Sequence, residues 1–435
     1  MAYIKQIMFA ILTLTLPSVS MGEGVSFESL KHLLLEKNLN IKISKAEIEI
    51  AKERYKVERS YLFPTVSIKF YNEYLKDLRN SPTYINGQYY IGSTGYSSSV
   101  SLRFDYLIFD FGSRKYRLKM YKTSINTSKE NLSYMKEKQI LILLDKYYEA
   151  LINQERLASL NKLRQLYIEL YKANQRLYKA GMISKKNIIN IAIRLADISA
   201  QIEELKQRQD SIINEISFLV DKKLKNPYFE NFEEVNIEEN INIEELPEIV
   251  AYDKKIEEKE YQLKSERSNF FPKVQLFGRY SMSNFNRNDY VKTINGLQSV
   301  NWGIGFVVNL TLFNGFKTTH TVMQIKKEIE KLKLEKRLVI KQKETEIKTN
   351  YTDIKHNKLK IKQIKEKIKN IAEDLKNKER LYKVGKESKI NIIQKQIDIV
   401  NESLNLKLSE IKNLYIAKKL KILKEFSLEH RFSSN

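Results

Sequence analysis

Proline and glycine are nearly missing from two long stretches of the chain, and this constrains the fold more than any other feature. Residues 114–226 contain no proline and one glycine, Gly181, while residues 317–435 contain no proline and one glycine, Gly385. Glycine at the end of a helix lets the chain reverse, so each stretch predicts a long helical hairpin that turns at its glycine. The predicted helices are 113–180 and 184–220 in the first hairpin, and 317–385 and 388–426 in the second.

Apolar side chains in both stretches recur at alternating steps of three and four residues. The residues are Leu160, Leu163, Tyr167 and Leu170 in the first hairpin, and Ile393, Ile397, Val400 and Leu404 in the second. This spacing predicts a coiled-coil-like seam along which neighbouring helices pack.

The chain is an internal duplication. Residues 175–189 match 379–393 at ten of fifteen positions, and residues 58–64 match 266–272 at five of seven. A period of about 200 residues is too long for a solenoid, and a duplicated pair of hairpins explains it better.

The predicted division is a signal peptide at 1–22, a first repeat at 23–220, an acidic linker at 221–246, a second repeat at 247–426 and a tail at 427–435. The repeats also predict helices at 27–62 and 245–271.

Four segments alternate polar and apolar residues with a period of two, two of them in each repeat. They lie at 66–71, 100–108, 274–280 and 302–312. We expect two β-hairpins, at 64–110 and 272–313, with loops near 76–96 and 284–298. The two longer segments have enough residues to cross a bilayer as tilted strands.

The first residues predict export. Lys5 precedes an apolar run at 7–16, and Pro17 and small residues follow, as in a secretory signal that is too short to span a bilayer. No later stretch is apolar enough for a transmembrane helix. Export also makes chromosomal DNA an improbable partner, so no nucleic acid is expected.

The strand pattern leaves two interpretations open. A soluble sheet with one wet face shows the same alternation. The export signal, the bulky aromatic face and the lack of another apolar layer favour a membrane barrel. Four strands cannot close such a barrel, because the smallest have about eight, so the chain must oligomerise: two copies supply eight strands and three supply twelve.

Composition excludes several classes of site. Lys and Arg total 76 against 53 Asp and Glu, a net charge of +23, but the Lys residues are mixed with Glu as on solvated helix faces. There is no cysteine, and the four histidines are far apart, so we expect no metal site and no cofactor. No catalytic motif is present, and the protein is not expected to be an enzyme.

The order of these features resembles the TolC-like family of outer-membrane efflux proteins over essentially the whole mature chain. The pieces that carry the resemblance are Leu62-Phe63-Pro64, Phe270-Phe271-Pro272, Leu107 to Gly112, Asn301 to Gly315, and the two blocks around Gly181 and Gly385. No single piece is specific to the family, and the resemblance rests on the ordered, duplicated set.

The resemblance implies a mainly α protein with a membrane β part: a homotrimer whose shared 12-stranded barrel in the outer membrane continues as a periplasmic tunnel of coiled-coil helices. It implies a passive exit duct of a tripartite efflux or type I secretion system. The implied partners are a periplasmic adaptor, an inner-membrane transporter of the RND or ABC type, and outer-membrane lipid. A non-channel coiled-coil anchoring protein of the envelope is the alternative.

The resemblance also implies two groups of site residues. The hairpin tips would form the periplasmic entrance: Tyr178, Gly181, Ser184, Asn187, Tyr382, Gly385, Lys386, Ser388, Lys389, Asn391 and Gln394. The chain would enter and leave the barrel at Pro64, Phe109, Asp110, Gly112, Pro272, Phe313, Asn314 and Gly315.

At the tips this chain departs from its family. Family members often carry acidic residues where Asn187, Asn391 and Gln394 stand, and those acids form a cation-binding ring. Amides beside Lys386 and Lys389 predict an entrance that is neutral to positive. The alternative is that the asparagines only cap or pack the helix starts.

Overall fold

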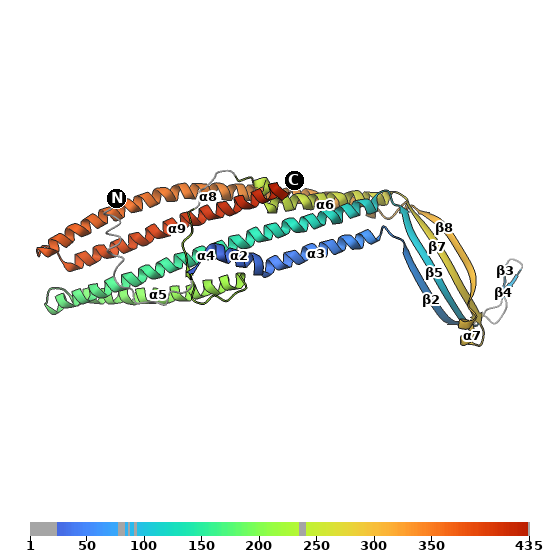
Figure 1. Ribbon diagram of the computed structural model, residues 1–435, viewed down its shortest axis with the longest axis horizontal. Helices are drawn as coiled ribbons and strands as arrows, with labels where there is room; N and C mark the ends of the chain where they lie inside the picture. The colour runs from blue at the N-terminus through green and yellow to red at the C-terminus, as the bar shows by residue number, and fades with distance from the viewer. Residues whose placement is uncertain (1–23, 77–82, 86–87, 91–93, 235–240, 434–435) are drawn as a thin grey trace. The chain divides into compact units, whose positions relative to one another are not determined.

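The computed structural model describes residues 24–76, 83–85, 88–90, 94–234 and 241–433, so the predicted signal peptide at 1–22 lies outside the described residues. The chain divides into two compact units, and Figure 1 labels the helices and strands that they contain. The first unit comprises Met1–Lys45, Glu130–Val250 and Leu338–Asn435, and the second comprises Ala46–Lys129 and Ala251–Arg337.

The second unit contains a four-stranded antiparallel sheet in the order β2-β5-β7-β8. Its strands are β2 (Thr65–Leu75), β5 (Gly95–Phe109), β7 (Lys273–Asn286) and β8 (Gln298–Asn309). Each predicted strand segment is therefore present. The prediction for the last strand was wrong at its end, because Leu310 and Leu312 lie beyond β8 and are exposed.

The two loops between these strands hold further short elements. Strands β3 (Thr83–Ile85) and β4 (Gln88–Tyr90) pair within the first loop, parts of which lie outside the described residues. The second loop contains α7 (Tyr290–Asn295), which begins after Asp289 because the Asp289 side chain accepts a hydrogen bond from the Lys292 amide.

Long helices form both predicted hairpins. Helices α4 (Ser113–Lys179) and α5 (Lys185–Leu219) make the first, and α8 (Lys317–Lys383) and α9 (Lys389–Ser433) make the second. The tail predicted at 427–435 was wrong over most of its length. Helix α9 continues because Phe426 and Ser427 are still buried. No helix among the described residues is both long and apolar enough to span a membrane.

The single helix predicted at 27–62 was also wrong, because Asn38 divides it into α2 (Phe27–Lys37) and α3 (Leu39–Ser60). Asn38 has an extended ψ of 129°, and its Oδ1 accepts from the amides of Asn40 (2.9 Å) and Ile41 (3.2 Å). The side chain thus caps the start of α3. The helix predicted at 245–271 is shorter, since α6 covers Pro247–Arg267 and 3-10 turns flank it at Ile243–Glu245 and Ser268–Phe270.

The core of the first unit surrounds Tyr147 of α4. Its ring contacts Phe27 and Phe229 edge-on, and its hydroxyl lies 2.9 Å from the Val25 carbonyl oxygen and 2.6 Å from that of Glu230. The segment predicted as a linker contributes to this core. Strand β6 (Tyr228–Phe229) lies within it and pairs in parallel with β1 (Gly24–Val25).

Candidate functional sites at the hairpin tips and in the sheet

The two hairpin tips have the same backbone conformation. At the first, Gly181 has φ +74°, its amide donates to the Tyr178 carbonyl (2.9 Å), and the Met182 amide donates to the Leu177 carbonyl (2.9 Å). At the second, Gly385 has φ +75° and the same two bonds reach Tyr382 and Leu381. Both are Schellman endings, in which a left-handed residue closes the helix, and this explains the glycine in each copy.

A serine precedes the second helix of each hairpin. Ser184 precedes α5 and makes no side-chain capping bond, although its carbonyl accepts from the Asn187 amide (3.2 Å). Ser388 precedes α9, and its hydroxyl accepts from the Ile390 amide (3.2 Å). The predicted tip residues therefore lie in or beside the two hairpin turns of the first unit, and Asn391 and Gln394 are exposed on the first turns of α9.

Glu387 is a tip residue that the sequence reasoning missed. Its Oε1 accepts from the Ser388 amide (2.7 Å) and from the Asn391 side-chain amide (2.6 Å), while Lys378 lies 3.3 Å from its Oε2. The hydrogen bond from the Ser388 amide, followed by those from Asn391 and Lys378, lowers the pKa of this carboxyl. The signal for Glu387 was available, because it stands where the first copy has the apolar Ile183.

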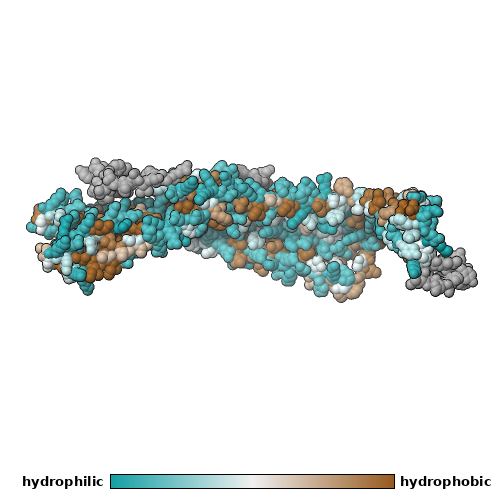
Figure 2. All heavy atoms as spheres, turned by 90° about the horizontal axis from the view of Figure 1, so that it is seen from below, coloured by the Kyte–Doolittle hydropathy of each residue, from teal (hydrophilic) through white to brown (hydrophobic). Residues whose placement is uncertain are grey.

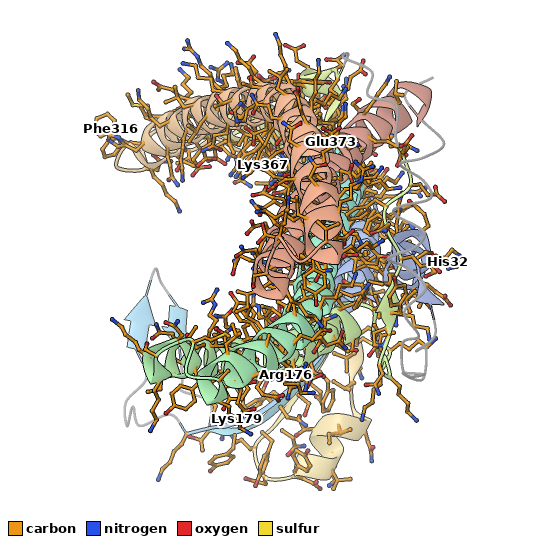
Figure 3. All side chains as sticks on the ribbon, turned by 90° about the vertical axis from the view of Figure 1, so that its left-hand side faces the viewer. His32, Arg176, Lys179, Phe316, Lys367 and Glu373 are labelled. Carbon is orange, nitrogen blue, oxygen red and sulfur yellow. The ribbon has the colours of Figure 1, made fainter. Side chains whose placement is uncertain are left out.

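Basic side chains dominate both tips. Residues 170–196 contain six basic residues and no acidic residue, and residues 375–397 contain seven basic residues and two acidic residues. Arg176 and Lys179, labelled in Figure 3, lie in the last turn of α4. The negative end of the helix dipole stabilises cationic side chains at this position.

The first tip also presents apolar side chains to solvent. Met182, Ile189 and Ile193 are exposed by 72%, 47% and 56%, and Figure 2 shows hydrophobic side chains gathered over this end of the hairpin. The second tip has Lys386 and Glu387 at the positions of Met182 and Ile183. The two tips therefore share a backbone and differ in surface chemistry.

The two hairpins contact each other near these tips. Side chains of α4, α5 and α9 meet in one buried cluster: Leu163, Leu170, Ile198, Ile202, Ile393 and Ile397. Seam residues predicted from the sequence, among them Leu160, Tyr167 and Val400, belong to this cluster or pack against it. An ion pair between Lys407 and Glu155 (2.9 Å) also joins the hairpins.

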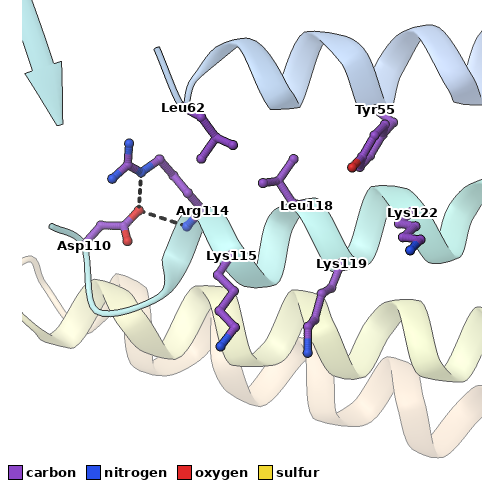
Figure 4. A pocket seen from close by; sticks show the side chains of 8 residues that line it. All are labelled: Tyr55, Leu62, Asp110, Arg114, Lys115, Leu118, Lys119 and Lys122. Atoms are coloured by element: carbon purple, nitrogen blue, oxygen red, sulfur yellow. Dashed lines mark hydrogen bonds and ion pairs between the residues drawn. The ribbon is translucent and has the colours of Figure 1, made fainter. Parts of the chain in front are cut away.

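A second site lies where the sheet passes into helix α4. Asp110 caps the helix, since its carboxylate accepts from the amides of Gly112 (3.2 Å) and Arg114 (2.9 Å) and from Arg114 Nε (3.0 Å). The Arg114 guanidinium also donates to the Tyr61 and Ile108 carbonyls (3.2 and 3.3 Å). Asp110 and Arg114 are both buried, and they line a groove of about 410 Å³ with the exposed ends of Lys115 and Lys119 beside them (Figure 4).

The second repeat makes this passage with a different capping residue. Asn314 replaces Asp110, and its side-chain amide donates to the Thr318 hydroxyl (2.8 Å). The backbone turn itself is shared, because Gly315 and Phe316 have positive φ as Phe111 and Gly112 do in the first repeat. Phe313 is 72% exposed. The two prolines predicted at the barrel, Pro64 and Pro272, directly precede β2 and β7. Phe109 ends β5 and stacks edge-on with Phe111.

The register separates the sheet into an apolar face and a polar face. One row of paired residues contains Ile68, Leu102, Tyr280 and Trp302, and the neighbouring row contains Ser67, Arg103, Arg279 and Gly303. Because side chains alternate along a strand, these rows point to opposite faces. Ile68 and Trp302 are 74% and 76% exposed, so the apolar face of this unit is uncovered.

This arrangement of helical hairpins and sheet is the fold of bacterial outer-membrane channels. The channel CmeC of Campylobacter jejuni superposes with a TM-score of 0.74 at 16% identity, covering 93% of this chain and 85% of that one. VceC of Vibrio cholerae gives a TM-score of 0.76 at 14% identity, covering 92% and 96%.

The family model for the outer membrane efflux protein matches residues 30–220 and 242–410, and the chain belongs to this family. The resemblance inferred from the sequence is thereby confirmed, and the family and its structural neighbours are channel proteins. The alkaline protease secretion protein AprF of Pseudomonas aeruginosa is 22% identical over 250 residues. That match covers 54% of this chain and 50% of AprF, so it spans about half of the curated relative.

Proposed function

We propose that this protein is a passive exit duct in the outer membrane, formed by three copies that share one barrel. The proposal is carried by the uncovered apolar face of the sheet and by its two outer strands, β2 and β8. Among the described residues, each of these strands pairs on one side only. Unpaired strand edges are not stable in lipid, so the edges must pair with other copies.

The number of copies follows from barrel closure. Four strands from one chain fall short of the roughly eight that the smallest membrane barrels need. Three copies supply twelve strands, the number expected for this family.

The long hairpins would extend the duct into the periplasm, with the Gly181 and Gly385 tips at its entrance. An inner-membrane transporter of the RND or ABC type would supply the energy, and a periplasmic adaptor would join it to the tips. The naming of one relative for protease secretion and the family's description as efflux proteins support both uses of such a duct. The two tips, residues 170–196 and 375–397, together carry thirteen basic residues and two acidic ones. This excess of basic side chains supports an entrance that is neutral to positive.

Two measurements test the proposal. The detergent-extracted protein should run as a trimer of about 150 kDa, three times the chain mass of 51.4 kDa. The trimer should also conduct ions in planar bilayers, which an anchoring protein without a pore would not do. A monodisperse monomer with a full β signal in circular dichroism would contradict the shared barrel.

A further inference from the structure

Every charged residue of the four sheet strands lies on the same face. The residues are Lys69, Glu73, Arg103, Asp105, Lys273 and Arg279, and strand β8 has none. The register places them on the polar face, in the rows that alternate with Ile68 and Trp302. Four cations against two anions leave this face with a net positive charge.

The two arginines lie side by side in the sheet. Arg103 of β5 and Arg279 of β7 are direct partners in the antiparallel register. Like charges placed directly opposite each other destabilise a sheet unless a counter-charge lies between them. An acidic neighbour or an anion from solution would relieve this repulsion.

Among the charged residues of the described strands, the acid next to this pair is Asp105, and Arg103 already engages it. Arg103 Nε lies 2.7 Å from Asp105 Oδ2, and its Nη2 donates to Asp105 Oδ1 (3.1 Å). Gln275 also donates to Asp105 Oδ1 (3.2 Å). Both carboxylate oxygens are therefore used, and Arg103 with Asp105 forms a neutral pair.

Arg279 has no such partner. Among the described residues, no carboxylate lies within ion-pair distance of its guanidinium, whereas the other arginine of the row has Asp105. On its other side, Arg279 pairs in register with Gly303 of β8. A Cβ at Gly303 would lie 3.9 Å from Arg279 Nε, so the glycine leaves the guanidinium uncovered on that side.

We infer that Arg279 makes the pore selective for anions and suits the duct to anionic solutes, such as those that carry carboxylate or phosphate groups. This inference rests on the proposed function, because the apolar face of a barrel meets lipid and the polar face then lines the lumen. Three copies place three unpaired guanidiniums at one height. A charged ring inside a channel with low-dielectric walls concentrates ions of the opposite sign.

The test is the reversal potential of the reconstituted trimer across a planar bilayer with a KCl gradient. The wild type should prefer chloride to potassium. Arg279→Gln should lower the chloride-to-potassium permeability ratio by about twofold or more, and Arg279→Lys should keep it, because only the first removes the charge. Asp105→Asn should raise the ratio, since it releases Arg103 from its partner.

The double variant Arg103→Gln with Asp105→Asn is the matched control, because it removes two opposite charges from the same face and should leave the ratio unchanged. Equal ratios in the wild type and Arg279→Gln, or a cation-selective wild type, would overturn the inference while leaving the duct in place. A trimer that conducts no ions at all would overturn the proposed function and the inference with it.

Discussion

The side-chain amide of Asn38 donates a hydrogen bond of 2.8 Å to the main-chain carbonyl of Leu219. Asn38 is buried, with 4% of its surface exposed, and it stands between α2 and α3, while Leu219 is the last residue of α5. One side chain thus starts α3 and ties that start to the end of α5 within the first unit.

Replacing Asn38 should destabilise the fold. Asn38→Ala removes an N-cap, worth about 1 kcal/mol, and a buried hydrogen bond worth a similar amount, so we expect a loss of about 2 kcal/mol in the free energy of unfolding. Urea unfolding followed by circular dichroism measures it. Asn40→Ala, at an exposed position of the same turn, should change the free energy little, and an equal loss in both variants would contradict the role given to Asn38.

Asn38 also shows where the sequence was insufficient. The two hairpins, the four strands and the two glycine turns followed from periodicity and from the absence of proline. The break at Asn38 could not be predicted in this way. The residues around an asparagine in an apolar-periodic stretch do not show whether it caps a helix or lies on the helix surface. The partner that fixes it, Leu219, is 181 residues away in the chain.

A buried carboxyl predicts how stability depends on pH. Glu137 of α4 is 1% exposed, and Lys343 Nζ lies 3.6 Å from its Oε1 and 3.7 Å from Glu248 Oε2. Burial raises the pKa of Glu137 from 4.5 to about 7, with Glu248 and Glu346 adding to the rise and Lys343 opposing it.

The sign follows from the protons bound in each state. Between pH 4.5 and 7 the folded protein holds the Glu137 proton more tightly than the unfolded chain does, so stability should fall as the pH rises through this range. Glu137→Gln should remove most of this slope and should stabilise the protein above pH 7, on the order of 3 kcal/mol.

Urea midpoints measured from pH 4 to pH 8 test this expectation. Glu257→Gln, at a half-exposed carboxylate, is the matched control, and an equal change of slope in both variants would contradict the role given to Glu137. A Glu137→Gln profile as steep as that of the wild type would show that another group titrates.

The glycine at the second tip offers a test of the entrance. Gly385 has φ +75°, and no atom of the described part of the chain lies within 4 Å of a Cβ built there. A substitution is therefore limited by its own backbone and not by these neighbours. Gly385→Val forces a β-branched residue into the left-handed region at a cost of about 1–2 kcal/mol. We expect it to abolish export while the trimer forms normally.

Gly385→Asn is the control, because asparagine tolerates this conformation and occurs at helix ends of this type. Export by cells that carry each variant, together with the trimer content of their membranes, separates the two. If the valine variant exports as well as the asparagine variant, the tip does not require the Schellman ending.

The internal repeat predicted the positions of the tip residues, but it predicted their chemistry only in part. Matching 175–189 with 379–393 identified both turns, which the structure forms with the same two hydrogen bonds. The matching did not identify Glu387, because the two copies differ at this position, where the first copy has Ile183. Arg103 and Arg279 became partners only through the register of β5 with β7, which the alternation alone could not give.

The last prediction concerns cations at the tip. In the wild type the Asn391 amide donates to Glu387 (2.6 Å) and Lys378 lies beside the same carboxylate, so the single acid at this turn is already paired. A trivalent cation added on the periplasmic side should therefore not block single-channel currents at micromolar concentration.

Asn391→Asp combined with Gln394→Asp adds two carboxylates per copy next to Glu387, and these should lower the blocking concentration by on the order of tenfold. The variant with Asn391→Ala and Gln394→Ala removes the same amides without adding charge and should stay unblocked. Micromolar block of the wild type would show instead that the entrance binds cations as an acidic ring does.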